Sequence, residues 1–306
     1  MKTFLITFTL AILCHACAQE KKDKASDLVY LNSSANLDKQ NEFYQDSLIE
    51  FDDSNKVYFD QSIGFDRFIN RYDTVIIDQE IFFIVQGDLL LDMDEMVDYY
   101  STYFNDTTQY EKLVIDVLPD GKINKMPNAD QLTYAVVRSS FPSENEYKSV
   151  VRYMAEATRN WSDILPEKVA FKHLSYLDDQ LRPSQQHPDV TFTIRHYNSG
   201  GKFVAAAFFP HYSKYRWKVR IDPSYYTTRA DKVGVLRHEI GHILGFRHEH
   251  IRAEAPIDCP REDDTTFDPL TSYDKVSVMH YPCGGFGDLN LAFTEKDIKG
   301  SRLIYN

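Results

Sequence analysis

The sequence has no hydrophobic run long enough to cross a membrane, few cysteines and fewer basic than acidic side chains. Its N-terminal apolar run, Phe4 to Leu13, is too short to span a bilayer. Against 46 aspartates and glutamates there are 34 lysines and arginines, a formal net charge of -12, which argues against nucleic acid or an anionic membrane as partner. No internal repeat or low-complexity tract is present. With 43% hydrophobic and 26% charged residues, the composition is that of a soluble globular protein.

The N-terminus, MKTFLITFTLAILCHACAQE, has the layout of an export signal: one early lysine, the short apolar run and then small residues. Ala16-Cys17-Ala18 fits a cleavage site before Gln19. Cys17 also resembles a bacterial lipidation cysteine, although such sites usually have an aliphatic residue where this chain has Cys14. Both interpretations predict that the protein leaves the cytoplasm. It would be secreted, or held at a bacterial cell surface or in the periplasm by a lipid on Cys17, its only expected membrane contact.

The acidic residues are concentrated in the first part of the chain. Residues 19–130 carry 24 acidic and 10 basic side chains, a net charge of -14, whereas residues 131–306 carry 22 acidic and 23 basic ones. This difference suggests two separable units, an acidic one followed by a nearly neutral one.

Hydrophobic periodicity predicts both strands and helices. Two strands are expected in DTVIIDQEIFFIVQGDLLL, followed by a helix over about Met93–Phe104. Further strands are expected in LTYAVV, VAFKHL, VTFTIRHY, FVAAAFF and RWKVRID. Residues suited to cap helices are Ser143 with Glu146, Asp231, and Thr294 with Asp297.

One stretch, RHEIGHILGFRHEH from Arg237 to His250, contains four histidines and two glutamates. His238 and His242 are four apart, so on a helix they lie on one face and can bind one ion. Glu239 is within reach of a water held by that ion. Gly245 can take the left-handed conformation that ends a helix, so that His248 returns as a third nitrogen ligand. Three neutral imidazoles with one open position are typical of a catalytic zinc site, whereas structural sites usually have four protein ligands.

The alternative is a histidine-rich surface helix or a set of core histidines satisfied by hydrogen bonds. For any one of these histidines that alternative is the better interpretation. For the whole pattern it is not, because chance produces H-E-x-x-H-x-x-G-x-x-H on the order of 10⁻⁵ times in a chain of this size.

The stretch HEIGHILGFRH resembles the long zinc-binding signature of the metzincin metallopeptidases, and SVMHY, Ser277 to Tyr281, resembles their methionine turn. The extension HEHIR and the tyrosine after Met279-His280 are most similar to the astacin branch. HEIGH followed by FRHE resembles the bacterial dual-action HEIGH metallopeptidases. The resemblance covers about Met126 to the C-terminus, where MPNADQLTYAVV is similar to the opening of astacin-like catalytic domains.

This resemblance implies an α+β fold, in which a mixed twisted sheet packs against two long helices and a small C-terminal subdomain bearing the methionine turn closes a zinc cleft. It implies a zinc-dependent endopeptidase with one catalytic Zn²⁺ and an extended polypeptide substrate. The substrate would pair with an edge strand around Val204–Phe208. We expect a monomer.

The same resemblance assigns roles to single residues. His238, His242 and His248 would bind the zinc, and Glu239 would be the general base. Met279 would form an apolar floor beneath the metal. Tyr281 would stabilise the oxyanion, unless it is an ordinary core tyrosine. Glu249 matches a glutamate that is often tied to the mature N-terminus in this family; a plain surface carboxylate is the alternative.

In the acidic part, VQGDLLL from Val85 to Leu91 resembles the segment of astacin propeptides whose aspartate occupies the open zinc position and keeps the zymogen inactive. Asp88 would be this latency ligand, although Val85 stands where the family has phenylalanine. The alternative is that Gly87-Asp88 is simply a hairpin turn. We therefore predict a signal peptide or lipoprotein signal at residues 1–18, a pro-segment at 19–125 and a catalytic domain at 126–306, with an activation cut between Asp120 and Gln131.

Beyond the signal only Cys259 and Cys283 remain. In an oxidising compartment we expect them to form a disulfide, and two buried thiols are the alternative. A protein of a different class, a non-catalytic zinc-stabilised binding or adhesion domain of metzincin fold, would also retain the histidines. The presence of Glu239 argues against it, because a site without catalysis has no need of its base.

Overall fold

The structure is a computed structural model that describes residues 65–85, 87–105, 114–118, 121–259 and 267–306. The chain divides into two compact units, Met1–Asp66 and Arg67–Asn306, and every element from β1 onward lies in the second. The predicted export signal, with Cys17, falls outside the described residues. Within the described part, no helix combines the length and the apolarity needed to cross a membrane.

The region predicted as pro-segment contributes a small antiparallel sheet flanked by two helices. Its elements are α2 (Phe65–Ile69), β1 (Thr74–Ile77), β2 (Glu80–Val85), β3 (Leu89–Leu91) and α3 (Met93–Asn105). Two strands were expected here, and the structure has three, because the chain turns at Gly87 and pairs Val85 with Leu89. Gly87 has φ +90°, a conformation that side chains disfavour and glycine adopts readily. The expected helix after these strands is confirmed as α3.

A five-stranded mixed sheet forms the centre of the molecule. Its strands are β5 (Leu132–Val136), β6 (Phe171–His173), β7 (Phe192–His196), β8 (Ala205–Ala206) and β9 (Lys218–Ile221). The order is β6-β5-β7-β9-β8, with β8 antiparallel to β9 at one edge and all other pairs parallel. The strand expected over FVAAAFF is thus reduced to two residues, because only Ala205 and Ala206 keep register with β9.

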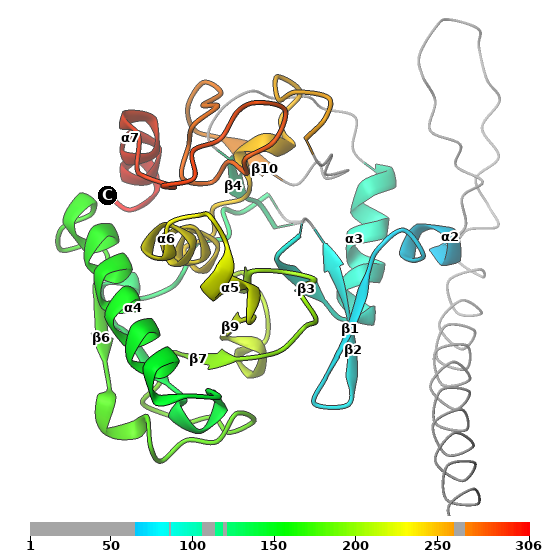
Figure 1. The fold of residues 1–306 in the computed structure, drawn as a ribbon. Helices are drawn as coiled ribbons and strands as arrows, with labels where there is room; N and C mark the ends of the chain where they lie inside the picture. Colours follow the sequence, from blue (N-terminus) through cyan, green and yellow to red (C-terminus); the bar gives the residue numbers. More distant parts are fainter. Residues whose placement is uncertain (1–64, 86, 106–113, 119–120, 260–266) are drawn as a thin grey trace, which may run out of the picture. The chain divides into compact units, whose positions relative to one another are not determined.

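Two long helices, α4 (Glu144–Ile164) and α6 (Lys232–Ile243), pack against each other beside this sheet (Figure 1). The predicted caps are confirmed: Ser143 Oγ accepts from Glu146 N, and Asp231 Oδ1 accepts from Gly234 N at 2.7 Å. Trp161 of α4 joins the helices by donating to Arg237 O and stacking on Phe246. The expected α+β architecture, a mixed sheet with two long helices, is therefore present.

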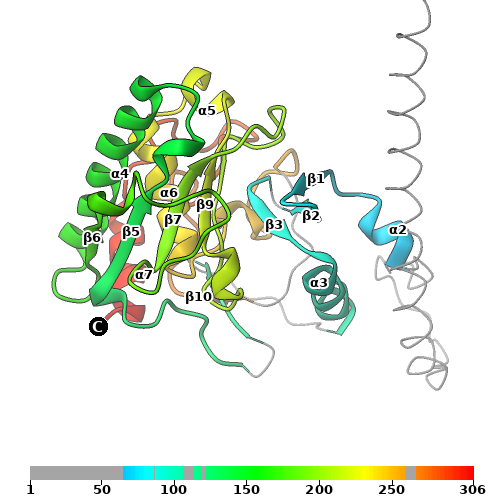
Figure 2. The ribbon, with the colours of Figure 1, turned by 90° about the horizontal axis from the view of Figure 1, so that it is seen from below.

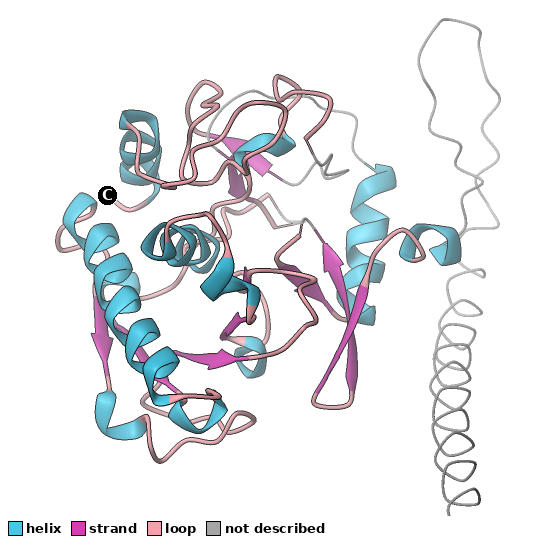
Figure 3. Ribbon diagram, viewed as in Figure 1, coloured by secondary structure: helices cyan, strands magenta, loops and turns pink. Residues whose placement is uncertain are grey.

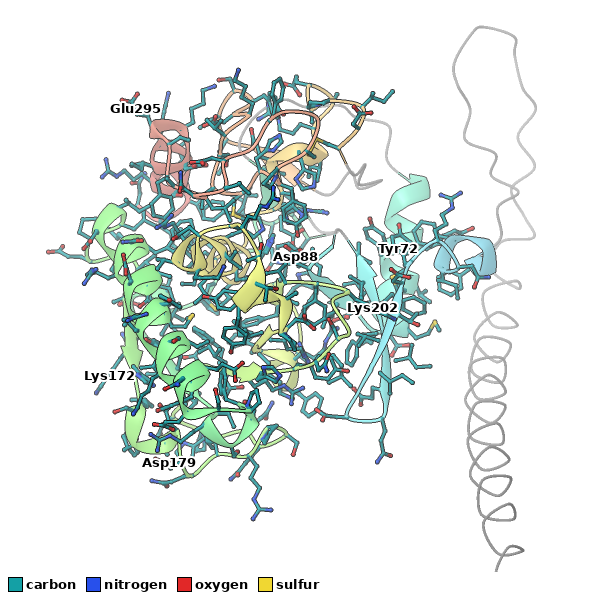
Figure 4. The ribbon with its side chains drawn as sticks, viewed as in Figure 1. Tyr72, Asp88, Lys172, Asp179, Lys202 and Glu295 are labelled. Atoms are coloured by element: carbon teal, nitrogen blue, oxygen red, sulfur yellow. A yellow bond between two sulfur atoms is a disulfide. The ribbon has the colours of Figure 1, made fainter. Side chains whose placement is uncertain are left out.

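The hairpin β1–β2 packs on the central sheet from the side opposite α4 (Figure 2). A buried apolar cluster joins the two, made of Val75, Ile77, Phe82, Ile84, Leu90, Phe203 and Ala206. Polar contacts at its edge run from Tyr197 Oη to Ile76 O and from Lys202 Nζ to Thr74 O. Lys202 is labelled in Figure 4. The predicted pro-segment and catalytic domain therefore share one packed core from residue 67 onward, and their boundary stays a prediction.

After α6 the chain is mostly loop (Figure 3). The remaining elements are β4 (Val114–Asp116), β10 (Phe267–Pro269), α5 (Ser224–Thr227), α7 (Glu295–Ile304) and the 3-10 helices η1 (Ala129–Gln131), η2 (Arg138–Ser140), η3 (Ser175–Leu177), η4 (Lys214–Arg216) and η5 (Glu249–Ile251). The predicted capping box of Thr294 and Asp297 begins α7. A disulfide joins Cys259 to Cys283, so the expected pair forms.

Candidate metal centre

Helix α6 carries His238 and His242 and ends just before a glycine that turns the chain. Gly245 has φ +100°, and its N–H bonds to His242 O. A Cβ added to Gly245 would lie 2.1 Å from Asn124 O, so no other residue fits without moving the backbone. The chain can therefore leave the helix abruptly and place His248 opposite the two helical histidines, as the sequence predicted.

The three imidazoles converge on one point. The Nε2 atoms of His238 and His248 are 3.1 Å apart, and that of His242 is 3.2 Å from each. All three rings are buried. Ligand nitrogens that share a tetrahedral zinc at about 2.0–2.1 Å would be roughly 3.3 Å apart, so the spacing fits that ion.

Hydrogen bonds on the far side of two rings fix which nitrogen faces the centre. His238 Nδ1 lies 2.8 Å from Val278 O, and His242 Nδ1 lies 2.8 Å from Phe246 O. A carbonyl oxygen only accepts, so each Nδ1 donates and each neutral ring turns its Nε2 lone pair inward. Burial lowers the pKa of His242 to about 4, which keeps that ring neutral, as a metal ligand must be. Lone pairs this close repel one another unless a cation lies between them.

Asp88 supplies a fourth group from the acidic part of the chain (Figure 4). Its Oδ2 is 3.2 Å from His238 Nε2, 3.1 Å from His248 Nε2 and 3.5 Å from His242 Nε2, and it accepts a hydrogen bond from Tyr281 Oη. Gly87-Asp88 is also a turn, between β2 and β3. The two interpretations of this dipeptide are therefore compatible: the turn delivers the carboxylate.

Glu239 lies beside the three nitrogens with an unsatisfied carboxylate. The residue is buried, and its Oε2 has no hydrogen-bond partner among the described residues. Burial raises the pKa of Glu239 well above 4.5, and the negative charge of Asp88 raises it further. A carboxyl group with a raised pKa suits proton transfer at neutral pH.

With this geometry described, the known families can be compared. Residues 125–259 match the sequence model of the Matrixin family. This region is metzincin-like. The family that it matches is one of zinc metallopeptidases, so zinc is the ion that the three imidazoles imply. The closer likeness to the dual-action HEIGH metallopeptidases, near the astacins, stays a prediction.

Among solved structures, one match is high choriolytic enzyme 1, a hatching-enzyme zinc protease from the medaka fish Oryzias latipes. The sequences are 17% identical, the alignment covers 59% of this chain and 92% of that one, and the TM-score is 0.36. No curated protein matches the chain.

Beneath the histidines of the metzincin-like region lies a turn containing Met279. His280 N bonds to Ser277 O across the turn, and Met279 is buried so closely against α6 that a Cβ on Gly241 would lie 2.4 Å from its sulfur. Asp297 holds the turn from behind, accepting from Ser277 Oγ and Val278 N. The sequence indicated Asp297 only as a helix cap, and its second role carried no local signal. Naming this segment the methionine turn of the family stays a prediction.

Glu249 is buried, so the surface-carboxylate alternative is wrong. Its Oε1 accepts from Arg252 at 2.9 Å and from Asp274 N at 2.8 Å. Burial raises the pKa of Glu249 to about 8. The hydrogen bond from Asp274 N to Glu249 ties η5, which directly follows His248, to the loop that leads into the Met279 turn. It therefore fixes the position of the third histidine.

A second group of potential ligands, Cys259, Cys283 and His280, lies nearby. Its two sulfurs are bonded to each other, so neither is a thiolate ligand. His280 is engaged on both nitrogens, by Tyr273 Oη at 2.6 Å and Tyr281 O at 2.6 Å. Among the described residues the metal centre is therefore the cluster of three histidines and Asp88.

Proposed function

We propose that this protein is a zinc-dependent endopeptidase, exported from the cytoplasm and made as a latent precursor. The observation that carries the proposal is the convergence of three buried imidazole nitrogens beside the unsatisfied carboxylate of Glu239. Proteins use this combination to activate water against a carbonyl group. The export signal at residues 1–18 and the Cys259–Cys283 disulfide both support a location outside the cytoplasm.

His238, His242 and His248 would hold a zinc ion, and that ion would supply Lewis-acid chemistry, polarising a carbonyl group and making a water easier to deprotonate. Glu239 takes the proton as that water attacks the peptide carbonyl, and then donates it to the leaving amine. Burial raises the pKa of Glu239, which makes its carboxylate a stronger base than that of an exposed glutamate. Tyr281 Oη, which now donates to Asp88, would donate to the carbonyl oxygen once Asp88 leaves.

In this proposal the substrate binds along the edge strand β8. In this structure Leu89, directly after Asp88, forms a parallel bridge with Ala207 at the end of β8. The acidic segment thus covers both the metal centre and part of the edge next to it. When that segment moves away, the backbone of the edge is free to pair with an extended polypeptide.

Latency is tested in the full-length chain by Asp88→Ala. Because a carboxylate at the fourth corner excludes substrate, the variant should cleave a mixed peptide library at least about tenfold faster than the wild type, a change of about 1.4 kcal/mol. Asp94→Ala is the matched control, since Asp94 is an exposed residue of the same segment and lies in α3. A chelator should abolish the gain. Equal rates for Asp88→Ala and wild type would end the latency proposal.

The alternative, a non-catalytic binding domain, predicts a different result. In that case neither Asp88→Ala nor wild type would cleave any peptide, although both would bind zinc. Mass spectrometry of the library, with and without chelator, separates the two functions and also reads the cleavage specificity.

A further inference from the structure

The outer face of the central sheet, away from α4, carries three cations in adjacent positions. Arg220 lies on this face, because its guanidinium is 5.8 Å from the ring of Phe82 in the covering hairpin. Lys218 is two residues earlier on β9 and therefore points the same way. Arg195 of β7 is in register with Arg220. We name Arg195, Lys218 and Arg220 the cationic face.

All three side chains are almost completely buried, with exposures of 2–3%. Arg195 has partners: Asp78 Oδ2 at 3.2 Å and Pro183 O at 2.7 Å. The side chains of Lys218 and Arg220 have no hydrogen bond or ion pair with any residue in the described ranges. Their nearest companions are rings, Tyr215 at 4.1 Å from Lys218 Nζ and Phe82 for Arg220.

Only one carboxylate, that of Asp78, is bonded to these three cations. Asp78 and Glu80 attract Lys218, and Asp78 attracts Arg220, only without a hydrogen bond, so the cluster keeps a net positive charge. An unpaired charge away from water is destabilising, so such groups normally have a counter-ion. Burial lowers the pKa of Lys218 to about 8 and that of Arg220 to about 9, and the neighbouring Arg195 lowers both further. Both groups nevertheless stay mainly protonated at neutral pH.

A cavity of about 670 Å³ opens at the Lys218 end of this face, and neither Arg195 nor Arg220 lines it. Lys218 and its register partner Thr193 line it, together with Lys214 and the amides of Asn128, Gln131 and Gln185. Asp189 is the one carboxylate among the lining residues. The cavity is large enough for a small organic molecule and offers it ammonium and amide donors.

We propose that the cationic face binds an oxyanion, a phosphate or an organic carboxylate, at Lys218, the member of the face that lines this cavity, with Arg220 two residues away adding positive charge. The anion offsets the charge that the fold leaves unpaired, and the amides hold the rest of the ligand. Because Phe82 and Asp78 of the hairpin flank the face, an anion bound there also stabilises the packing of residues 74–85 on the sheet. This site is separate from the metal centre and does not depend on peptidase activity.

Thermal unfolding of the full-length chain tests the proposal. Inorganic phosphate and glucuronate are titrated separately, with chloride holding the ionic strength constant. The wild-type Tm should rise saturably, by about 5 °C when the anion reaches a hundredfold excess over its Kd. A response to phosphate alone identifies an inorganic ligand, and a response to glucuronate alone an organic carboxylate.

Lys218→Met and Arg220→Met should lose the saturable rise, and each should have a higher Tm than the wild type in chloride alone, because an unpaired buried charge is gone. Lys172→Met removes an exposed lysine of β6 that does not line the cavity, and this variant should respond like the wild type. The proposal is overturned if wild type shows no saturable response to either anion, or if the two buried-cation variants respond as wild type does. Should those variants fail to fold, calorimetric titration of the wild type decides, and no heat of binding from either anion overturns it.

Discussion

At residue 245 the path from the helix to the third histidine depends on the absence of a side chain. Gly245→Ala adds a Cβ 2.1 Å from the carbonyl oxygen of Asn124 and places alanine at φ +100°. We expect the free energy of unfolding to fall by more than about 3 kcal/mol, since backbone strain and overpacking each contribute 1–3 kcal/mol. Zinc affinity should fall with it. Chemical denaturation and a zinc titration measure the two effects.

Gly200→Ala is the matched control for this change. Gly200 also has a positive φ, +75°, but nothing lies within 4 Å of its added Cβ. In Gly200→Ala the free energy of unfolding should therefore fall only by the conformational cost of the positive φ, about 1 kcal/mol. The variant should keep its zinc. Equal losses for the two variants would mean that the contact with Asn124 does not matter.

Single residues of the site were largely readable from the sequence. The spacing of His238, His242 and His248 predicted the convergence that the structure has, because an i, i+4 pair on a helix followed by a glycine leaves little freedom. The support around them was not readable. Asp297 reaches Ser277 across 20 residues, and Glu249, which directly follows His248, reaches Asp274 across 25. Contacts between distant segments leave no periodic signal.

At the scale of elements, Arg216 at the end of η4 holds the strand that follows Asp88. Its buried guanidinium contacts Leu90 O and the carboxylates of Asp92 and Glu95, which begin α3. It also lies over the ring of Phe82. One residue outside the acidic segment therefore anchors β3 and α3 together.

Arg216→Met should loosen this segment. We expect a loss of about 1–3 kcal/mol in the free energy of unfolding, because Leu90 O loses a donor and two carboxylates lose their partner. Hydrogen exchange should be faster in residues 89–95, and little changed in α4. Lys214→Met, an exposed neighbour in η4, is the control. Unchanged exchange in β3 would contradict the anchoring role.

Element boundaries show where sequence patterns are sufficient. Ser143, Asp231 and Thr294 begin their helices as predicted, because a cap is a local contact between residues three apart. The strand over FVAAAFF was predicted too long, because its length depends on pairing with β9, which lies more than ten residues away. Residues 73–91 form three strands because the turn at Gly87 lets Leu89 pair with Val85, and this pairing also could not be predicted from periodicity.

At the scale of the whole molecule, residues 67–105 and the central sheet form one core, which charge distribution alone did not reveal. The acidity of the first part predicted a separate unit. The structure instead packs apolar residues of that part, such as Phe82 and Leu90, into a core shared with Phe203 and Ala206, and the Phe82 ring also covers Arg220.

This burial predicts a pH dependence of stability. The pKa of Lys218 is lowered to about 8 in the folded chain from 10.5 when exposed, so between these values the unfolded chain binds more protons. Stability contributed by Lys218 therefore rises with pH from about 8 to about 10.5. In chloride, wild type should be less stable than Lys218→Met at pH 7, by no more than about 3 kcal/mol, and the two should converge by pH 10.5. Urea unfolding at several pH values measures this, and parallel curves would contradict it.

The most direct test of the central claim is the zinc content of the purified full-length chain, measured by mass spectrometry after dialysis. The convergence of His238, His242 and His248 predicts one zinc ion per chain, retained in Glu239→Gln, whose side chain is not a ligand, and lost in His248→Ala. Finding no zinc in the wild type, or undiminished zinc in His248→Ala, would contradict the account.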